Sequence, residues 1–351
     1  MATMYYRPGV TSWNTGSAGS WSNTSGGANN GLVPDATTDV VFDFRSAPTC
    51  DLVNASDGGG SMVRCKSITT IGWGGNFGAS IGDGLDVRGD ADLSGVNSYG
   101  AGRLQLSGTG TFKPWRSAGA NVAIYAAAQP GVVITMGADL YLASGLTIGY
   151  DASCVFNANG FNITARNISI NGVANMGSGM WTVTESSQGA QTFSVATGAT
   201  INAGTSTLKF SNAVGPTIRL YFNGGGKSFN NVWVDYPGGA TLQINDSGNT
   251  FSDLKVSAGA AVGFLGGVAL TLGSLTSLGN PAQKITLRGT PSSPSQYTIN
   301  KSGGSVGYID YADISWLNAS PGSWLARSSA NSGNNTGITF VPGNSNFISF
   351  M

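Results

Sequence analysis

The sequence predicts an all-β protein built as a β-solenoid, in which short strands stack coil upon coil. Apolar residues recur two apart in short runs bounded by Gly, Asn, Asp or Ser, which is the pattern of strands with one buried face. Successive runs lie roughly 18 to 25 residues apart, a loose period typical of solenoids. Good helix formers are scarce, whereas glycine occurs 54 times in 351 residues. A β-sandwich or jelly roll is the alternative architecture.

The predicted strands recur along most of the chain. In order, the clearest are Leu85–Arg88, Leu104–Leu106, Leu140–Leu142, Ile168–Ile170, Leu208–Phe210, Leu242–Ile244, Leu254–Val256 and Ile285–Leu287. Two longer stretches, 228–234 and 250–256, both read Phe-x-x-apolar-x-apolar, as repeated coils would. No single coil buries its apolar face, so stacking of coils must bury it. The one helix-friendly stretch, Tyr125–Gln129, is ended by Pro130.

Aromatic residues divide the chain into three predicted segments: 1–45, 46–305 and 306–351. The middle segment is the solenoid body, and the outer two gather aromatic side chains. An open solenoid end would expose strand edges and core, so we interpret both outer segments as caps or contact surfaces. The candidates for contacts with a partner are Trp13, Trp21, Tyr308, Tyr311, Trp316, Trp324 and Phe340.

Composition excludes several classes of function. The chain carries 17 basic and 17 acidic residues, so it has no excess of positive charge to attract a phosphate backbone. Binding to nucleic acid is therefore not expected. It has no histidine, which excludes a Ser-His-Asp triad, a Cys-His pair and a histidine-ligated metal. Glu185 is its one glutamate. We therefore expect no cofactor and no metal.

The cysteines and the apolar stretches indicate where the protein is made. The first residues show neither a basic nor an apolar signal-peptide region, so we expect synthesis in the host cytoplasm without secretion by a signal peptide. Cys50, Cys65 and Cys154 are then expected to be free thiols. Residues 258–272 are apolar but interrupted by Gly, Ser and Thr, which favours buried strands over insertion into a membrane.

Aspartates supply the candidate carboxylate sites. Asp83, Asp86, Asp90 and Asp92 form one cluster, and in a strand the last three would share a face with Arg88, opposite Leu85 and Val87. This cluster predicts either a carboxylate pair or calcium site, or a solvated face on which Arg88 pairs with its neighbours. The solvated face is favoured, and no catalytic residue is assigned.

A second set, Asp235, Asp246 and Asp253, falls on consecutive predicted coils, where stacking brings carboxylates together. Glycan hydrolysis usually needs two carboxylates at a set separation. The neighbours of Asp235 and Asp246 read as turns, in which Asp usually bonds its own backbone. That interpretation is favoured here as well.

The two ends of the chain carry a resemblance. The opening has Trp13-x7-Trp21, Gly26-Gly27-Ala28, residues 34–43 (PDATTDVVFD) and residues 66–69 (KSIT). The ending has residues 306–315 (VGYIDYADIS), 318–320 (NAS), 324–326 (WLA) and 332–337 (SGNNTG). Together they resemble β-helical surface proteins of tailed-phage virions and of some repeat-rich bacterial surfaces. The resemblance covers the ends well and the middle only in style.

This resemblance implies a right-handed parallel β-helix, often trimeric, that forms part of a virus particle. We therefore expect a non-enzymatic structural protein on the virion surface, most simply a capsid decoration (cement) protein or head fibre. The implied partners are two further copies of the chain, the major capsid or tail proteins, and for a fibre a host-surface glycan. The alternatives are a tail fibre for host attachment or a tailspike-like glycan depolymerase, and the lack of a separate adaptor domain disfavours the tailspike. A bacterial adhesin is a third class.

Overall fold

The computed structural model describes residues 2–13, 19–52, 62–78, 83–100, 102–115, 123–212, 215, 217–236, 238–290, 295–303, 305–320 and 323–342. In these ranges the chain forms β-strands and no helix. It divides into two compact units. Unit 1 comprises Met1–Gly179 with Ala196–Asn202, and unit 2 comprises Met180–Val195 with Ala203–Met351.

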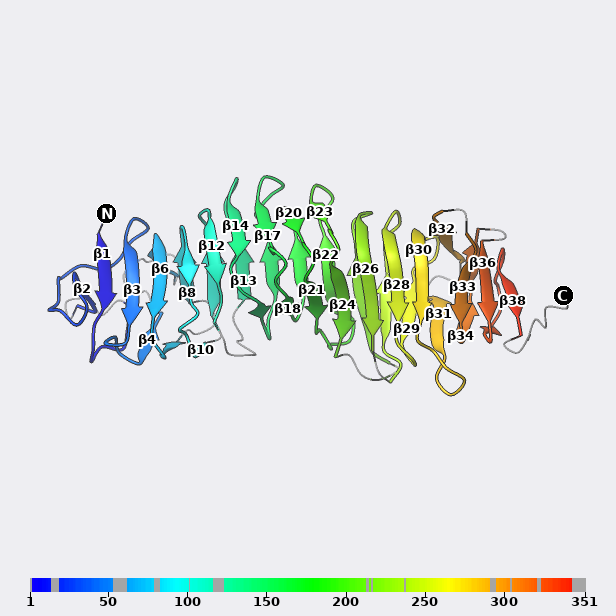
Figure 1. The fold of residues 1–351 in the computed structure, drawn as a ribbon, viewed down its shortest axis with the longest axis horizontal. Coiled ribbons are helices and arrows are strands. Elements are labelled where there is room, and N and C mark those ends of the chain that lie inside the picture. Colours follow the sequence, from blue (N-terminus) through cyan, green and yellow to red (C-terminus); the bar gives the residue numbers. More distant parts are fainter. Residues whose placement is uncertain are drawn as a thin grey trace, which may run out of the picture. The chain divides into compact units, whose positions relative to one another are not determined.

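Unit 1 is built from parallel sheets that each take one strand from each successive coil (Figure 1). The first sheet contains β1 (Thr3–Tyr6), β2 (Trp21–Ser22), β3 (Asp39–Asp43), β6 (Ser67–Ile71), β9 (Ala91–Asp92), β12 (Gly110–Lys113), β14 (Val133–Met136), β17 (Val155–Asn157), β20 (Val173–Asn175) and β23 (Thr200–Asn202). The second contains β5 (Met62–Cys65), β8 (Gly84–Val87), β11 (Arg103–Leu106), β13 (Ala123–Ala126), β16 (Leu146–Ile148) and β19 (Ile168–Ile170). Shorter strands form the third side: β4 (Thr49–Asp51), β7 (Asn76–Gly78) and β10 (Ser98–Tyr99), followed by β15 (Leu140–Tyr141) and β18 (Ile163–Ala165).

Unit 2 follows the same plan. One sheet contains β22 (Gln191–Val195), β25 (Arg219–Asn223), β27 (Thr241–Ile244), β29 (Ala261–Phe264), β31 (Ile285–Gly289), β34 (Ala312–Ser315) and β37 (Ala330–Asn331). Another contains β21 (Met180–Val183), β24 (Thr207–Ser211), β26 (Ser228–Asp235), β28 (Thr250–Val256), β30 (Ala269–Ser277), β32 (Tyr297–Lys301) and β35 (Leu317–Ala319). A third contains β33 (Gly307–Asp310), β36 (Trp324–Arg327) and β38 (Thr339–Val341).

The register stacks like residues on one another and so builds the core. Leu208 of β24 pairs with Val232 of β26, which pairs with Leu254 of β28, and all three are buried. Between them on each strand lie outward residues, such as Lys209. The two-residue alternation therefore sets which side chains line the interior, and removing this apolar surface from water is the main stabilising contribution.

These pairings confirm the predicted all-β solenoid. Apart from the antiparallel pair β1–β2, the paired strands named above run parallel, whereas a sandwich or jelly roll is built from antiparallel strands. Coil length varies more than the predicted period. Val155 pairs with Val173, 18 residues later, but Ala269 pairs with Thr298, 29 residues later. The one helix-friendly stretch forms no helix, and its first residues, Tyr125 and Ala126, belong to strand β13.

The predicted end segments join the sheets of the body. Strand β3, from segment 1–45, pairs residue for residue with β6, and β34, from segment 306–351, pairs with β31. The three cysteines are free thiols, as expected, and all three are buried. Burial raises the pKa of Cys50 and of Cys65, so both are held as uncharged thiols.

Candidate functional site

The first aspartate cluster lies on two different sheets. Asp86 is in β8 of the second sheet, whereas Asp92 ends β9 of the first sheet, with a corner at Asp90 between them. The expectation that Asp86, Asp90 and Asp92 share one strand face is therefore wrong: the chain turns between the two strands. Asp83 lies just before β8, where its backbone oxygen accepts a hydrogen bond from the amide of Arg103.

Asp86 is the most enclosed carboxylate of this cluster. Its side chain is only 4% exposed, and its Oδ2 lies 3.0 Å from Nε of Arg88 and 3.6 Å from Nε of Arg64. The hydroxyl of Ser107 donates to its other oxygen. Arg88 does pair with a neighbour, as the sequence suggested, but around a buried carboxylate rather than on a solvated face.

The other two carboxylates of the cluster serve local structure. Asp92 accepts hydrogen bonds from the amide and hydroxyl of Ser94 and lies 3.1 Å from Nζ of Lys113. Burial would raise the pKa of Asp92, but these hydrogen bonds and the Lys113 charge outweigh it and hold the pKa below its usual value. Asp90 accepts from the amide of Thr111 on the next coil. Among the described residues, no group of three or more Cys, Asp or Glu side chains is arranged to hold a metal ion.

The second aspartate set is also dispersed. Asp253 pairs in register with Asn231, four residues before Asp235 on β26, so the two carboxylates are about 13 Å apart along the sheet. Asp246 follows β27 and accepts from the backbone amides of Gly224 and Gly225 on the preceding coil. The expectation was a bond to its own turn backbone, whereas these bonds join two coils.

Asp235 belongs to a charged and aromatic row across unit 2. Lys209, Trp233 and Lys255 are paired in register, and both lysine Nζ atoms lie about 4 Å from the centre of the Trp233 ring. Lys209 Nζ is also 2.8 Å from Oδ2 of Asp235. The two lysine ammonium groups make cation–π contacts with the Trp233 ring. This row therefore links neighbouring coils and serves the structure.

The N-terminal aromatic candidates fill the core of unit 1. Trp13 and Trp21 are 1% and 0% exposed, and their ring centres are 4.8 Å apart. Trp21 donates its indole N–H to the backbone oxygen of Trp13, and Tyr6 and Phe42 complete the cluster. These tryptophans close the N-terminal end of the core as buried side chains, and they present no surface to a partner.

The C-terminal candidates divide between core, corners and surface. Trp324 is 1% exposed, and half-buried Phe340 is in register with the buried Ala326. Tyr311 and Trp316 are half-buried and take positive φ values of 48° and 63° at the corners before and after β34. Tyr308 is on the surface, 46% exposed. The guanidinium carbon of Arg327 lies 4.2 Å from the centre of its ring.

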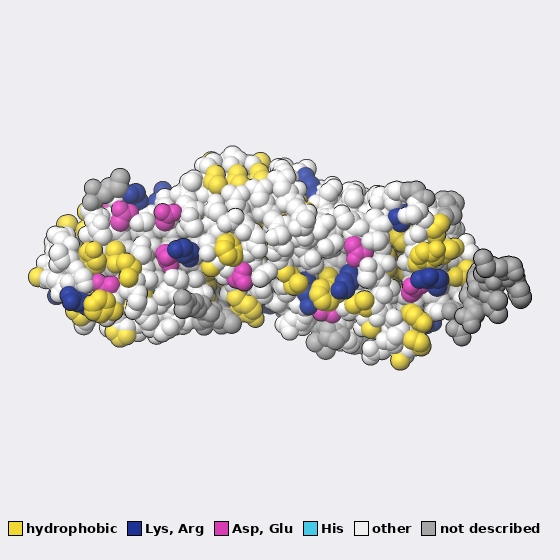
Figure 2. Space-filling view, viewed as in Figure 1, with side chains coloured by type: hydrophobic (Ala, Val, Ile, Leu, Met, Phe, Trp, Pro, Cys, Tyr) yellow, Lys and Arg dark blue, Asp and Glu magenta, His cyan; other side chains and the backbone are white. Residues whose placement is uncertain are grey.

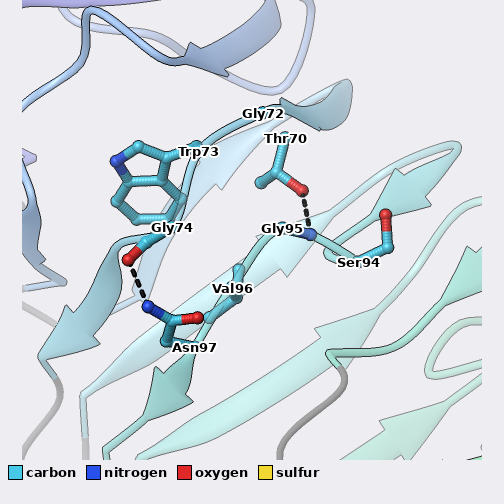
Figure 3. Close-up of a pocket in the computed structure, with 8 residues that line it drawn as sticks. All are labelled: Thr70, Gly72, Trp73, Gly74, Ser94, Gly95, Val96 and Asn97. Carbon is cyan, nitrogen blue, oxygen red and sulfur yellow. Dashed lines mark hydrogen bonds between the residues drawn. The ribbon is translucent and has the colours of Figure 1, made fainter.

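One groove is a corner whose polar groups already bond to one another. It has a volume of about 610 Å³ and lies where the chain leaves β6 and β9. Figure 3 shows the amide of Gly95 donating to Thr70, and Asn97 donating to the backbone oxygen of Gly74. Trp73 is only 3% exposed and donates its indole N–H to Ala47, so its ring is not displayed to a ligand.

A second groove, of about 370 Å³, is lined by Tyr308, Asp310 and Lys301 in unit 2. Arg327 covers one face of the Tyr308 ring and binds Asp310 through two nitrogens, each 2.6 Å from a carboxylate oxygen. The Lys301 ammonium donates to the backbone of Ser302. The charged groups Asp310 and Lys301 thus already have partners within the protein.

The third groove differs, because it displays aromatic rings. It has a volume of about 350 Å³ in unit 1 and is lined by Tyr125 and Tyr150, which are 38% and 67% exposed. Neither tyrosine is among the site residues predicted from the sequence. The signal for Tyr125 was its position in strand β13 between buried Ile124 and Ala126, which points it outward.

Charge is scattered on the face shown in Figure 2, where Lys, Arg, Asp and Glu form small mixed groups. No helix in the described part of the chain is long and apolar enough to cross a membrane. The chain matches no protein-family model, no curated protein and no solved structure with which it was compared.

Proposed function

We propose that this chain is a non-enzymatic structural protein displayed on the surface of a tailed-phage virion, as a capsid decoration protein or head fibre. The observation that carries the proposal is the residue-for-residue parallel stacking within each unit, exemplified by Leu208, Val232 and Leu254. Each coil is hydrogen-bonded to the next and shares its core, so few segments open locally. This construction suits a durable exterior component.

The arrangement of the aspartates supports a structural role over catalysis. Asp86 and Asp92 lie on different sheets, and Asp86, Asp92, Asp235 and Asp246 are each held by protein partners. A glycan hydrolase needs two carboxyl groups roughly 5 to 9.5 Å apart across one sugar. The end motifs that resemble virion proteins form integral strands, such as β33 and β34.

Immunogold electron microscopy tests the location. Antibody raised against the chain is applied to particles of the phage that encodes it. Label spread over the head supports decoration or a head fibre. Label confined to the tail contradicts that role and favours the tail fibre, and unlabelled particles contradict display on the virion.

We further propose that the functional assembly is a homotrimer that contacts other virion proteins. Exposed apolar side chains such as Tyr308 and Val306, 46% and 42% exposed, offer surface for such contacts. Sedimentation equilibrium of the purified chain measures its mass directly. A mass near three times 35.7 kDa supports the trimer, and a monomer at all concentrations contradicts it.

A further inference from the structure

We propose that the groove between Tyr125 and Tyr150 is a binding site for a neutral oligosaccharide built of pyranose sugars. This inference goes beyond the proposed structural role and does not depend on where the protein is displayed. The groove is formed by residues of unit 1 that are brought together by the stacking of four coils.

The register creates the floor of the groove. Gln105 of β11, Tyr125 of β13 and Thr147 of β16 are paired in a row, one from each coil. All three alternate with buried neighbours and therefore point away from the core. The row thus places an aromatic ring between an amide and a hydroxyl at the spacing of adjacent strands, about 4.8 Å.

A second row forms the wall, at the corners that follow these strands. Gln129 and Tyr150 lie at successive corners, and Asn171 follows on the next coil. The amide of Tyr150 donates to the backbone oxygen of Ala127, and Asn171 donates to the backbone oxygen of Gly149. The Cys154 thiol donates to the backbone oxygen of Gln129. The backbone of the wall and the Asn171 amide are therefore held in place before any ligand arrives, which lowers the entropic cost of binding.

The chemistry of these side chains matches a sugar. A pyranose ring presents C–H groups on its faces and hydroxyls around its edge. Exposed tyrosine rings can pack against the C–H faces with little loss of side-chain freedom. Gln105, Gln129 and Asn171 carry amides that can both donate and accept, as each sugar hydroxyl does.

Charge and size narrow the ligand class. The side chains that line the groove are all uncharged. The nearby guanidinium carbon of Arg103 lies 5.6 Å from the centre of the Tyr125 ring, so Tyr150, the more exposed of the two tyrosines, offers the freer ring to a sugar. Its volume of about 350 Å³ falls at the lower end of the range of small-molecule sites, about 300 to 1,000 Å³. In the groove at β6 and β9 the Trp73 ring is buried. In the groove at Tyr308 the guanidinium carbon of Arg327 lies 4.2 Å from the ring centre, closer than Arg103 lies to Tyr125, at 5.6 Å.

The test uses the full chain and a panel of neutral hexasaccharides of glucose, galactose, mannose and N-acetylglucosamine, in α- and β-linked forms, titrated by isothermal calorimetry. We expect at least one to bind with a dissociation constant tighter than about 1 mM. Tyr150→Ala and Tyr125→Ala should each weaken that binding about tenfold. Tyr141→Ala is the matched control, because Tyr141 is 48% exposed on unit 1 outside the groove, and its binding should stay within about twofold of wild type.

Three results would overturn the proposal. The first is that no panel member binds. The second is that Tyr141→Ala weakens binding as much as Tyr150→Ala, which would place the site elsewhere. The third is that a proline-rich peptide (decaproline) or an anionic oligosaccharide (an oligogalacturonate) binds at this groove more tightly than every neutral sugar. None of these results bears on the immunogold location, so the two proposals fail independently.

Discussion

Nε of Arg88 lies 3.0 Å from Oδ2 of Asp86, a carboxylate whose side chain is only 4% exposed. Arg64, on the strand before it, approaches the same oxygen at 3.6 Å, and Ser107, following the next strand, donates to the other oxygen. One carboxylate thus ties three successive coils together on the outer side of unit 1.

We expect Asp86→Asn to lower the free energy of unfolding by about 1.5 to 3 kcal/mol, since it removes charge-assisted hydrogen bonds and turns an amide toward two guanidinium groups. Urea denaturation followed by circular dichroism measures the loss. Asp90→Asn is the control: Asp90 is exposed, and an asparagine oxygen can still accept from Thr111. Equal losses in the two variants would contradict the role assigned to Asp86.

The aromatic core of unit 2 is centred on Phe222. Its ring stacks on Phe193 of the preceding coil, with 5.5 Å between ring centres, and contacts Phe229 on the next strand and Phe251, which is paired with Phe229. Phe222→Ala should cost about 3 to 5 kcal/mol, because the rigid coils cannot collapse into the cavity. Phe44→Ala deletes the same side chain where it is 73% exposed and should cost less than about 0.5 kcal/mol. Comparable losses in urea midpoint for both variants would rule out this account.

Two glycines with the same φ of +71° separate backbone strain from close packing. A Cβ on Gly177 would lie 2.8 Å from the backbone nitrogen of Gly160, whereas a Cβ on Gly131 would meet nothing within 4 Å. Gly131→Ala should therefore cost about 1 to 2 kcal/mol, the penalty of a left-handed conformation. Gly177→Ala should cost clearly more, because the neighbouring coil must also move. Thermal unfolding of both variants tests this order, and a reversed order would contradict it.

The alternation of apolar residues predicted the core well because burial in a stacked coil depends on local strand geometry. Leu208 and Phe210 read as inward positions from sequence, and both are buried. The corners were harder to predict. Tyr311 and Trp316 take left-handed backbone conformations that composition assigns to Gly or Asn. Contacts between coils impose them: each residue's amide bonds to a following coil, at Arg327 and Gly333.

The candidate groove could not be predicted from the sequence, for a related reason. Tyr125 and Tyr150 are 25 positions apart, and only the register of β13 with β16 brings their coils together. The same holds for Asp86, whose burial depends on Arg64 and Ser107 from other coils. Residues that converge by stacking leave no signal in a single sequence when coil lengths vary as they do here.

Acid should destabilise the protein, because several aspartates have a pKa below the usual value in the folded chain. Hydrogen bonds from Thr37 lower the pKa of Asp35, and hydrogen bonds from Ser153 lower that of Asp151. For Asp235, burial would raise the pKa, but the hydrogen bonds from Lys209 and Ser257 and the charges of Lys209 and Lys255 outweigh it and lower the pKa.

A carboxyl with a depressed folded pKa stabilises the fold above its unfolded pKa, near 3.8, and that contribution is lost as the pH falls through the folded value. Asp235→Asn should therefore cost about 1 kcal/mol at pH 7, the scale of a partly exposed ion pair with a hydrogen bond. The difference from wild type should shrink steadily between pH 4 and pH 2 as Asp235 itself becomes protonated. Urea midpoints measured at intervals from pH 7 to pH 2 test this, with a parallel series at about 1 M salt, where screening should reduce the difference at pH 7. A difference that stays constant across the pH range would show that the Asp235 charge does not stabilise the fold.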